Sequence, residues 1–450
     1  MFFIFVETKS EKMKNYASDK DVYTAANERI EFIFQEFSRV YLSFSGGKDS
    51  GVMLNLCIDY MRREKITDRK LGIMILDNEA NYEHSLTFMH KIIQDNLDIL
   101  DVYWCCLPIT LPCTVSAYAT EWQCWGVKDE KRWIRPMPTQ SYIVNIHNMP
   151  FIGWFEENMP YDEFWDKFGE WYGQGKSCAC LIGIRADESL NRYRAILNEA
   201  KTMYQGRSWT KKKIESQSSQ VYNCYPIYDW KTRDIWVANA RFGWEYNHLY
   251  DIFYMAGLNI AQMRVASPFM SESKSSLNLY RVIDPHVWVT LCARVQGANF
   301  IATYGKQINY HSFKLPAGHT WKSFVKFLLD TLPKEVAENF KMRFAQSLLF
   351  WGRTGRGLPE ETITELRENG VSFRENGTTP HGRKTKTRVR IQSFPDHLDF
   401  LSCHNSEVAS WKRFAITILK NDHTCKYMGL APTKEQAIRQ REIMEKYKDI

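Results

Sequence analysis

The stretch that decides the fold is Val40-Tyr41-Leu42-Ser43-Phe44-Ser45-Gly46-Gly47-Lys48-Asp49-Ser50. Residues 40–44 predict a short buried strand, and a helix is predicted over residues 50–64. Residues 43–50, here called the glycine-rich loop, connect the two. The first N–H groups of a helix have no partner within the helix, and the helix dipole favours negative charge there. A loop in this position is therefore suited to hold phosphate groups.

The residue types in the glycine-rich loop fit this interpretation. Gly46 and Gly47 lack a Cβ, so the backbone can turn tightly and approach a phosphate closely. Lys48 adds a cation. Asp49 would repel phosphate unless it caps the helix or holds Mg²⁺. The candidate phosphate-binding residues are Ser43, Ser45, Gly46, Gly47, Lys48, Asp49 and Ser50.

The loop is not of the Walker A type. That motif needs an earlier glycine, separated from its Gly-Lys pair by four residues, and a Ser or Thr directly after the lysine. Leu42 stands at the first position, and Asp49 stands at the second. The remaining alternative is an ordinary strand–turn–helix connection.

Strands and helices alternate outward from the loop. A strand at residues 71–76, a helix at 82–96 and a strand near 99–104 predict a parallel sheet with helices on both faces. Residues 105–160 are rich in Pro, Trp and Cys and interrupt this pattern, as an insertion would. The alternation then returns at residues 180–201 and 221–240. We therefore expect one α/β domain over residues 1–265.

The pattern changes after residue 265. Helical segments are predicted at residues 288–294, 321–332, 334–349, 410–421 and 433–448. We therefore expect a mainly helical domain over residues 266–450, with a polar, basic loop at about 366–394. The basic run at 383–390 is a mobile loop, a phosphate-binding patch or a solvated segment.

Composition and charge limit the possible classes. The chain has 450 residues, 44% of them hydrophobic, and a net charge of +7, which permits an anionic substrate or nucleic acid. The sequence has no uncharged apolar run of about 18 residues, so no membrane span is expected. The 11 scattered cysteines and the absence of a signal-like start predict a cytoplasmic protein with reduced thiols.

Several motifs together resemble a known superfamily. Ser45-Gly46-Gly47-Lys48-Asp49-Ser50 resembles the pyrophosphate loop of the adenine-nucleotide alpha-hydrolases, a group that includes ATP pyrophosphatases and phosphoadenosine-phosphosulfate (PAPS) reductases. Further segments resemble the reductase branch in the same order: Ile75-Leu76-Asp77-Asn78-Glu79, Gly183-Ile184-Arg185-Ala186-Asp187-Glu188-Ser189-Leu190-Asn191-Arg192 and Tyr225-Pro226-Ile227-Tyr228-Asp229-Trp230. The resemblance implies a Rossmann-like parallel sheet of the HUP type.

The resemblance also implies roles for residues outside the loop. Asp77 and Glu79 follow the second strand, where such proteins seat the adenosine. Arg185 and Arg192 can present forked donors to phosphate or sulfate. Glu188 either holds Mg²⁺ or pairs with an arginine, and an ion pair between Glu188 and Arg192 is the structural alternative. Lys48 and Arg185 are the expected catalytic residues.

The C-terminal half is similar to a narrower branch, the immunoglobulin-binding-regulator-A type of PAPS-reductase-like proteins. The segments that carry this similarity are Arg264-Val265-Ala266-Ser267-Pro268-Phe269, Arg294-Val295-Gln296-Gly297-Ala298-Asn299 and Ser410-Trp411-Lys412-Arg413. Bacterial members of this branch tend to be paired with a ParB-like protein, so the resemblance implies such a partner.

The sequence departs from true PAPS reductases in its cysteines. Those enzymes need a nucleophilic cysteine in a C-terminal tail, and residues 440–450 contain none, so thiol-dependent PAPS reduction is not expected. Related DNA-sulfur-modification enzymes hold an iron–sulfur cluster. The chain has no Cys-x-x-Cys, and Cys105, Cys106, Cys113 and Cys124 do not have a standard cluster spacing, so we expect buried thiols instead.

Three hypotheses follow from these observations. The leading one is an enzyme that binds ATP or a related adenylyl nucleotide with Mg²⁺ and cleaves between the α and β phosphates, releasing pyrophosphate and an adenylated acceptor. The second is a nucleotide-sensing regulatory or defence subunit that binds ATP or PAPS and acts with a ParB-like partner. The third is a sulfurtransferase-like enzyme that modifies nucleic acid, for which Lys128, Lys131, Arg132 and Arg135 among the tryptophans of the insertion, or the run 383–390, offer basic contacts.

Overall fold

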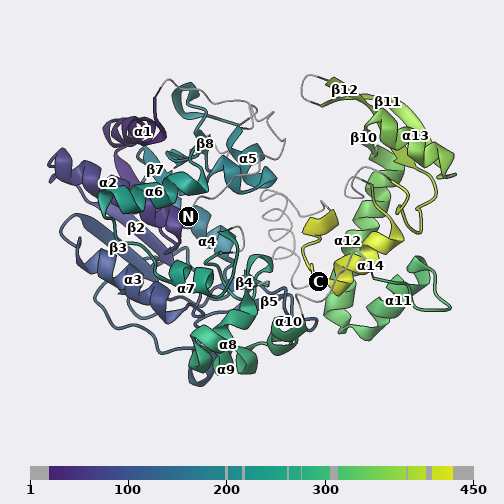
Figure 1. The fold of residues 1–450 in the computed structure, drawn as a ribbon, viewed down its shortest axis with the longest axis horizontal. Helices are drawn as coiled ribbons and strands as arrows, with labels where there is room; N and C mark the ends of the chain where they lie inside the picture. The colour runs from purple at the N-terminus through teal and green to yellow at the C-terminus, as the bar shows by residue number, and fades with distance from the viewer. Residues whose placement is uncertain are drawn as a thin grey trace, which may run out of the picture. The chain divides into compact units, whose positions relative to one another are not determined.

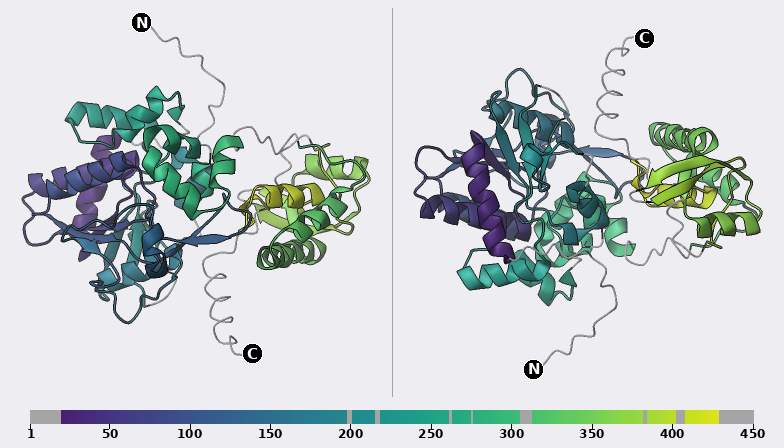
Figure 2. Two further views of the ribbon diagram at one scale, coloured as in Figure 1. Left: turned by 90° about the horizontal axis from the view of Figure 1, so that it is seen from below. Right: turned by 90° about the horizontal axis from the view of Figure 1, so that it is seen from above.

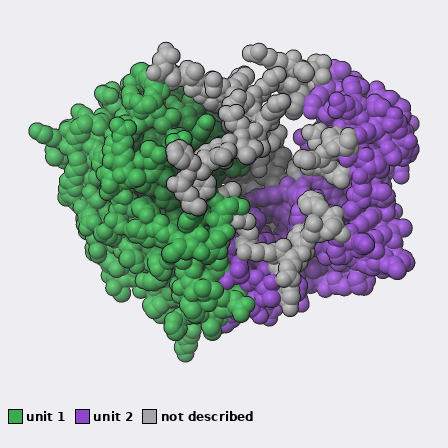
Figure 3. Space-filling model, viewed as in Figure 1, with its two compact units in different colours: residues 1–110, 123–267, 279–290 green, residues 111–122, 268–278, 291–450 purple. Residues whose placement is uncertain are grey.

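A computed structural model describes residues 20–197, 201–214, 218–260, 263–274, 276–304, 313–381, 384–401 and 408–428. The chain forms two compact units (Figure 3). Unit 1 comprises residues 1–110, 123–267 and 279–290, and unit 2 comprises residues 111–122, 268–278 and 291–450. Each unit thus takes a short segment from the other side of the boundary expected near residue 265.

Unit 1 is built on a seven-stranded sheet with the order β6-β3-β2-β1-β7-β9-β8. Neighbouring strands are parallel except for β8, which runs antiparallel to β9. This confirms the predicted, mostly parallel α/β sheet. Its strands are β1 (Arg39–Ser43), β2 (Leu71–Leu76), β3 (Leu100–Cys105), β6 (Ile143–Val144), β7 (Cys178–Leu181), β8 (Thr210–Lys212) and β9 (Val221–Cys224).

Helices cover both faces of this sheet (Figure 1). On one face α4 packs against β7 and β9, and the ring of Tyr41 meets Phe168 of α4. Residues next to Tyr41 on β1 point to the opposite face, where α1, α2 and α6 pack together. The helices are α1 (Val22–Glu36), α2 (Lys48–Arg63), α3 (Glu83–Gln94), α4 (Tyr161–Gly173), α5 (Leu190–Leu197), α6 (Thr232–Phe242), α7 (Leu249–Met255) and α8 (Tyr280–Ile283).

The strand order reverses direction beside β1. After β1 the chain builds β2, β3 and β6 on one side, and it then returns to build β7 and β9 on the other side. Ligands of open α/β sheets bind outside the carboxyl ends of the strands at such a switch point. The loops after β1 and β7 are therefore the positions where a ligand site is expected.

The expected insertion at 105–160 has little regular structure. It contributes β6 to the edge of the large sheet and a separate two-stranded sheet of β4 (Thr110–Pro112) and β5 (Glu121–Gln123). A 3-10 helix, η1 (Val127–Arg132), follows. Of the insertion, β6 thus extends the sheet of unit 1 at one edge, whereas residues 111–122 belong to unit 2.

Unit 2 contains the helical core expected in the C-terminal part. Phe340 and Phe344 of α12 and Phe414 of α14 are buried together, and the rings of Phe344 and Phe414 stack with centroids 4.2 Å apart. The remaining helices, of which α9 begins in unit 1, are α9 (Pro285–Arg294), α10 (Ala298–Tyr304), α11 (Trp321–Thr331), α12 (Lys334–Leu349), α13 (Glu360–Glu368) and α14 (Trp411–Leu419).

The prediction of a basic loop at 366–394 is wrong. Most of this segment forms two strands of an antiparallel sheet with the order β10-β12-β11, and its hairpin can be followed in Figure 2. The strands are β10 (Arg356–Leu358), β11 (Phe373–His381) and β12 (Lys384–Ile391). The alternation of basic with β-branched residues in β12 is a strand pattern that the high charge obscured.

Two further expectations concern the chain as a whole. The helix expected at 433–448 lies outside the described residues. Within the part of the chain that the structure describes, no helix combines the length and the apolar composition needed to cross a membrane.

Candidate functional site

The glycine-rich loop turns sharply between β1 and α2. Gly46 adopts φ +68°, a left-handed conformation that residues with a side chain rarely adopt. A Cβ at Gly46 would also lie 2.7 Å from Sδ of Met89. Gly47 is the N-cap of α2 and no side chain caps the helix, so Asp49 does not serve as the cap. Glycine is thus required at position 46 by both conformation and space.

The loop presents backbone N–H groups that lack acceptors. The N–H of Lys48 donates to the hydroxyl of Tyr250 at 3.1 Å, and the N–H of Gly47 makes a long contact of 3.4 Å to Oγ of Ser45. Buried backbone N–H groups are normally paired, so unpaired ones mark a place for a ligand. Within the described residues, no hydrogen bond engages the N–H groups of Ser45, Gly46, Asp49 and Ser50.

The three predicted serines differ in their surroundings. Ser43 is buried at the end of β1, whereas Ser45 is exposed. The hydroxyls of Ser45 and Ser50 lie 3.1 Å apart, and Ser50 also donates to the carbonyl of Gly47 at 3.1 Å. Ser45 and Ser50 therefore brace the turn, and the hydroxyl of Ser45 is the more accessible of the two.

Two cations converge on Asp49. Nζ of Lys48 lies 2.9 Å from Oδ2 of Asp49, and Nε of Arg185 lies 2.7 Å from Oδ1. The side chains of Lys48, Asp49 and Arg185 are only 11%, 14% and 2% exposed. Arg185 also lies 3.7 Å from Oδ2 of the more exposed Asp187. Both cations lie at the start of α2, where the helix dipole adds to the positive potential.

Arg185 reaches the loop from the end of β7. A Cβ at Gly183 would lie 2.9 Å from the carbonyl carbon and oxygen of Asp49, so only glycine permits this close approach of two backbones. Glu188 accepts the backbone N–H of Arg185 at 3.1 Å. Glu188 also forms an ion pair with Arg192 one helical turn later. The ion pair between Glu188 and Arg192, which the sequence left as the structural alternative, is therefore present.

Asp77 and Glu79 anchor the insertion instead of facing an open site. Their exposed fractions are 1% and 0%. Asp77 accepts the indole N–H of Trp104 at 2.6 Å and pairs with Arg135. Glu79 accepts the backbone N–H groups of Trp125 and Ile134 at 2.6 and 2.7 Å. Their side chains are thus engaged in holding the insertion, and we assign them to the framework of the site.

The basic and aromatic residues of the insertion are also partly internal. The guanidinium of Arg135 lies 4.9 Å from the ring centroid of Trp125, and the indole N–H of Trp125 donates to the carbonyl of Asp77 at 2.9 Å. Arg132 pairs with Asp129. These contacts stabilise the insertion, while Lys128, Lys131 and Arg132 remain exposed.

Sequence reasoning missed two residues that shape the loop. The amide of Asn247 donates to the carbonyl of Gly46 and to the hydroxyl of Ser85, both at 2.9 Å. Tyr250, on α7, bonds to the N–H of Lys48, and burial raises the pKa of its hydroxyl well above the usual range. Both residues lie about 200 positions from the loop, and no local motif identifies them.

The described residues do not form a magnesium site of their own. Among them, no group of three or more His, Cys, Asp or Glu side chains is placed to hold a metal ion. Both oxygens of Asp49 contact cations, and Glu188 is engaged by Arg185 and Arg192. Asp49 and Glu188, the predicted Mg²⁺ ligands, therefore do not fit a resident metal.

The cysteines near the sheet are buried thiols. Burial raises the pKa of Cys105, Cys106 and Cys224 well above the usual value. Burial also raises the pKa of Cys425 to about 12. A thiol must ionise to act as a nucleophile, so these four are poorly suited to that role.

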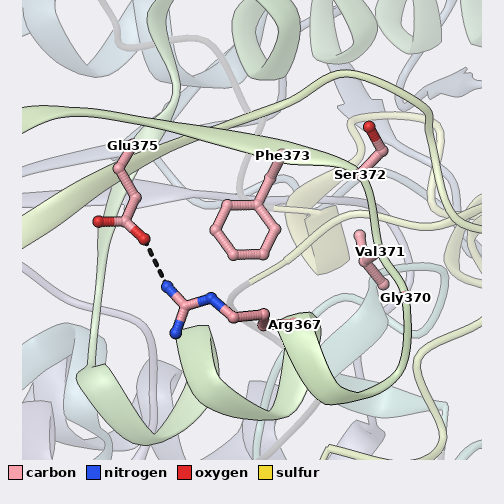
Figure 4. Close-up of a pocket in the computed structure, with 6 residues that line it drawn as sticks. All are labelled: Arg367, Gly370, Val371, Ser372, Phe373 and Glu375. Atoms are coloured by element: carbon pink, nitrogen blue, oxygen red, sulfur yellow. Dashed lines mark hydrogen bonds and ion pairs between the residues drawn. The ribbon is translucent and has the colours of Figure 1, made fainter.

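Unit 2 has a small open hollow of a different kind (Figure 4). Its charged residues, Arg367 and Glu375, bond to each other at 2.7 Å. The other lining residues are Gly370, Val371, Ser372 and Phe373. Because its two charges neutralise each other, this hollow is a weaker candidate for a polyphosphate than the glycine-rich loop.

Comparison with family models finds two matches along the chain. Residues 165–256 match the phosphoadenosine phosphosulfate reductase domain. Residues 257–439 match a domain of unknown function, DUF3440. The first match contains Arg185 and Tyr250, two of the residues that meet at the glycine-rich loop.

A curated relative and several solved structures are also similar to the chain. YbdN of Escherichia coli (strain K12), an uncharacterized protein, is 30% identical over 422 residues, which is 92% of each chain. The PAPS reductase of Candida auris is 12% identical, with a TM-score of 0.30 over 54% of this chain and 88% of that one. The U34-tRNA thiolase NcsA of Methanococcus maripaludis is 11% identical, with a TM-score of 0.29 over 66% and 82%.

Proposed function

Since the chain belongs to the family of Escherichia coli YbdN and carries a phosphoadenosine phosphosulfate reductase domain, we propose that it binds ATP at the glycine-rich loop and cleaves the bond between the α and β phosphates. The observation that carries this proposal is the set of unpaired N–H groups at residues 45, 46, 49 and 50, beside Lys48 and Arg185. Polyphosphate oxygens are the acceptors that such a set of donors lacks.

The position of the loop supports the same assignment. It lies at the carboxyl ends of β1 and β7, where the strand order reverses, and nucleotides bind at this place in open α/β sheets. Gly183 and Gly46 leave no side chain between the two loops, so the backbone can closely approach a ligand. Lys48 and Arg185 supply the positive charge that a triphosphate needs.

In the proposed reaction an acceptor nucleophile attacks the α-phosphorus. The bond from the α-phosphorus to the bridging oxygen breaks, and pyrophosphate leaves with that oxygen and its electron pair. The acceptor gains the adenylyl group from ATP and loses its proton to solvent. Lys48 and Arg185 stabilise the charge that develops on the departing pyrophosphate, which is catalysis by positioning and electrostatics. No step assigned to this chain passes through a metal ion.

Pyrophosphate release tests this proposal. The purified full-length chain is incubated with ATP, with and without Mg²⁺, and pyrophosphate and orthophosphate are measured separately. We expect pyrophosphate from the wild type and at least a hundredfold lower rate from Lys48→Ala, with unchanged thermal unfolding. Lys128→Ala, at an exposed lysine of the insertion, is the matched control and should retain the wild-type rate.

Two outcomes would contradict the proposal, and each would favour a different function. Release of orthophosphate alone would mean that the β–γ bond is cleaved. Binding of ATP without release of pyrophosphate, alone or with candidate acceptors, would indicate the nucleotide-sensing role, in which the protein acts with a ParB-like partner. Titrating the protein with ATP and with PAPS under the same conditions shows which of the two nucleotides is the ligand.

A further inference from the structure

A second cationic surface lies in unit 2, on the antiparallel sheet. Successive residues of a strand point to opposite faces. Val389 and Ile391 of β12 are 0% and 4% exposed and pack with Leu366 of α13 in one apolar core. The residues that alternate with them, Lys386, Arg388 and Arg390, therefore belong to the face turned away from this core.

The neighbouring strands complete this face. Arg374 of β11 is directly opposite Arg390 in the ladder, and residues opposite each other in an antiparallel pair share a face. On the other side, Gly357 of β10 is directly opposite Arg388 and carries no side chain to cover it. We call Arg374, Lys386, Arg388 and Arg390 the basic sheet face.

The charges of the basic sheet face are not neutralised internally. In the described parts of unit 2, none of its four cations takes part in an ion pair, whereas Arg367 of α13 pairs with Glu375 at 2.7 Å. A cluster of like charges without counter-charges inside the unit produces a positive potential that can attract an anion from outside.

The arrangement is linear and regular. Residues on one face of a strand recur about every 6.6 Å, so β12 presents three cations in a row. A row of this kind matches a chain of phosphates better than it matches a single compact anion. Two-stranded β-ribbons and sheets are established elements for contacting nucleic acids, and phosphate contacts by Lys and Arg need no base readout.

We propose that the basic sheet face binds the sugar–phosphate backbone of a nucleic acid. The contact is independent of sequence, because only cationic side chains are presented. It goes beyond the nucleotide site proposed above and does not depend on it, since the two surfaces belong to different units. The chain thereby combines a nucleotide-binding unit with a unit that can hold a polynucleotide.

Fluorescence anisotropy with the full-length chain tests the inference. The probes are a labelled 30-base-pair DNA duplex, a labelled 30-nucleotide single-stranded DNA and the RNA of the same sequence, titrated between 50 and 250 mM salt. The variant is Lys386→Gln with Arg388→Gln, and the matched control is Lys326→Gln with Lys341→Gln, at exposed lysines of α11 and α12. Arg388→Lys preserves the charge and serves as a second variant.

We expect the wild type to bind at least one probe with a steep salt dependence. The double variant should bind at least tenfold more weakly, and the slope of log K against log salt should fall by about 2 for the loss of two phosphate contacts. The control and Arg388→Lys should keep the wild-type slope. A comparison of the three probes identifies the type of nucleic acid.

Three results would overturn the inference. One is the absence of binding by the wild type to all three probes at 50 mM salt. Another is an unchanged salt slope in a double variant that retains wild-type thermal unfolding. The third is equal loss of binding in the Lys326 and Lys341 control, which would show that only net charge matters. If the double variant does not fold, Arg374→Gln, at an exposed position, replaces it in the same comparison.

Discussion

Asp49 contacts both cations of the proposed nucleotide site. Its carboxylate contacts Nζ of Lys48 at 2.9 Å and Nε of Arg185 at 2.7 Å. A phosphate oxygen that approaches these cations must share them with this carboxylate. Asp49 therefore has two opposing effects, since it keeps the cations in position and weakens their attraction for a second anion.

Asp49→Asn should separate these two effects. Arg185 is 2% exposed and loses the nearer of its two carboxylate partners, the other being Asp187 at 3.7 Å, so the free energy of unfolding should fall by about 1–3 kcal/mol. ATP or pyrophosphate should bind about tenfold more tightly, because a nearby negative charge has been removed. Thermal unfolding with and without ATP measures both, and the stabilisation by ATP should be larger than in the wild type. A smaller stabilisation would show that Asp49 is needed mainly for positioning.

Arg185→Lys tests whether the several N–H donors of the guanidinium are needed, because the positive charge is kept. Arg185 bonds to Asp49 through Nε and to the carbonyl of Trp230 through a second nitrogen at 3.4 Å. A lysine carries the charge but cannot make both contacts in one plane. We expect at least tenfold weaker ATP binding by calorimetry, with a stability loss below that of Arg185→Ala. Binding equal to the wild type would show that charge alone is sufficient.

At the scale of elements, the site depends on the close approach of the chain after β7 to the chain after β1, which a glycine at position 183 permits. Gly183 follows β7, and a Cβ at this position would lie 2.9 Å from backbone atoms of Asp49 at the start of α2. Backbone atoms cannot move aside as a flexible side chain can. The separation of the loops after β1 and β7 is thus set by the absence of one methyl group.

Gly183→Ala should disturb this contact in a measurable way. We expect a loss of about 1–3 kcal/mol in the free energy of unfolding, as for other overpacked positions, together with weaker ATP binding. Gly352→Ala is the matched control, because nothing lies within 4 Å of its Cβ position. Urea unfolding and ATP titration of both variants provide the comparison, and equal behaviour of the two would contradict the role given to Gly183.

Local patterns allowed the main elements to be predicted, and long-range contacts limited the rest. The apolar run Leu71–Leu76 and the glycine-rich loop indicated a parallel sheet and its phosphate-binding turn, and the sheet is confirmed. Tyr250 and Asn247 could not be found, because they reach the loop only through the fold. The strand β12 was missed because its charges suggested a solvated loop, although its alternation has period two.

At the scale of the whole molecule, two units carry two different cationic surfaces. The glycine-rich loop belongs to unit 1, which has the seven-stranded sheet, and the basic sheet face belongs to unit 2. Each unit has its own buried core. A ligand that binds one unit should therefore protect mainly the amides of that unit from exchange.

Hydrogen–deuterium exchange should show this division. With ATP we expect slower exchange in peptides that cover residues 43–51 and 182–188, and no change in peptides that cover β11 and β12. With the nucleic acid that binds most tightly we expect the reverse. Mass spectrometry of the same peptides in both experiments makes the comparison direct. Protection by ATP confined to β11 and β12 would place the nucleotide in the wrong unit.

Isothermal titration of the full-length protein with ATP tests the central claim most directly. The claim is that the unpaired N–H groups after β1, together with Lys48, hold the polyphosphate. We predict one-to-one binding to the wild type and at least tenfold weaker binding to Lys48→Ala, with both proteins equally folded. No measurable binding to the wild type, or equal affinity in the two proteins, would contradict the account.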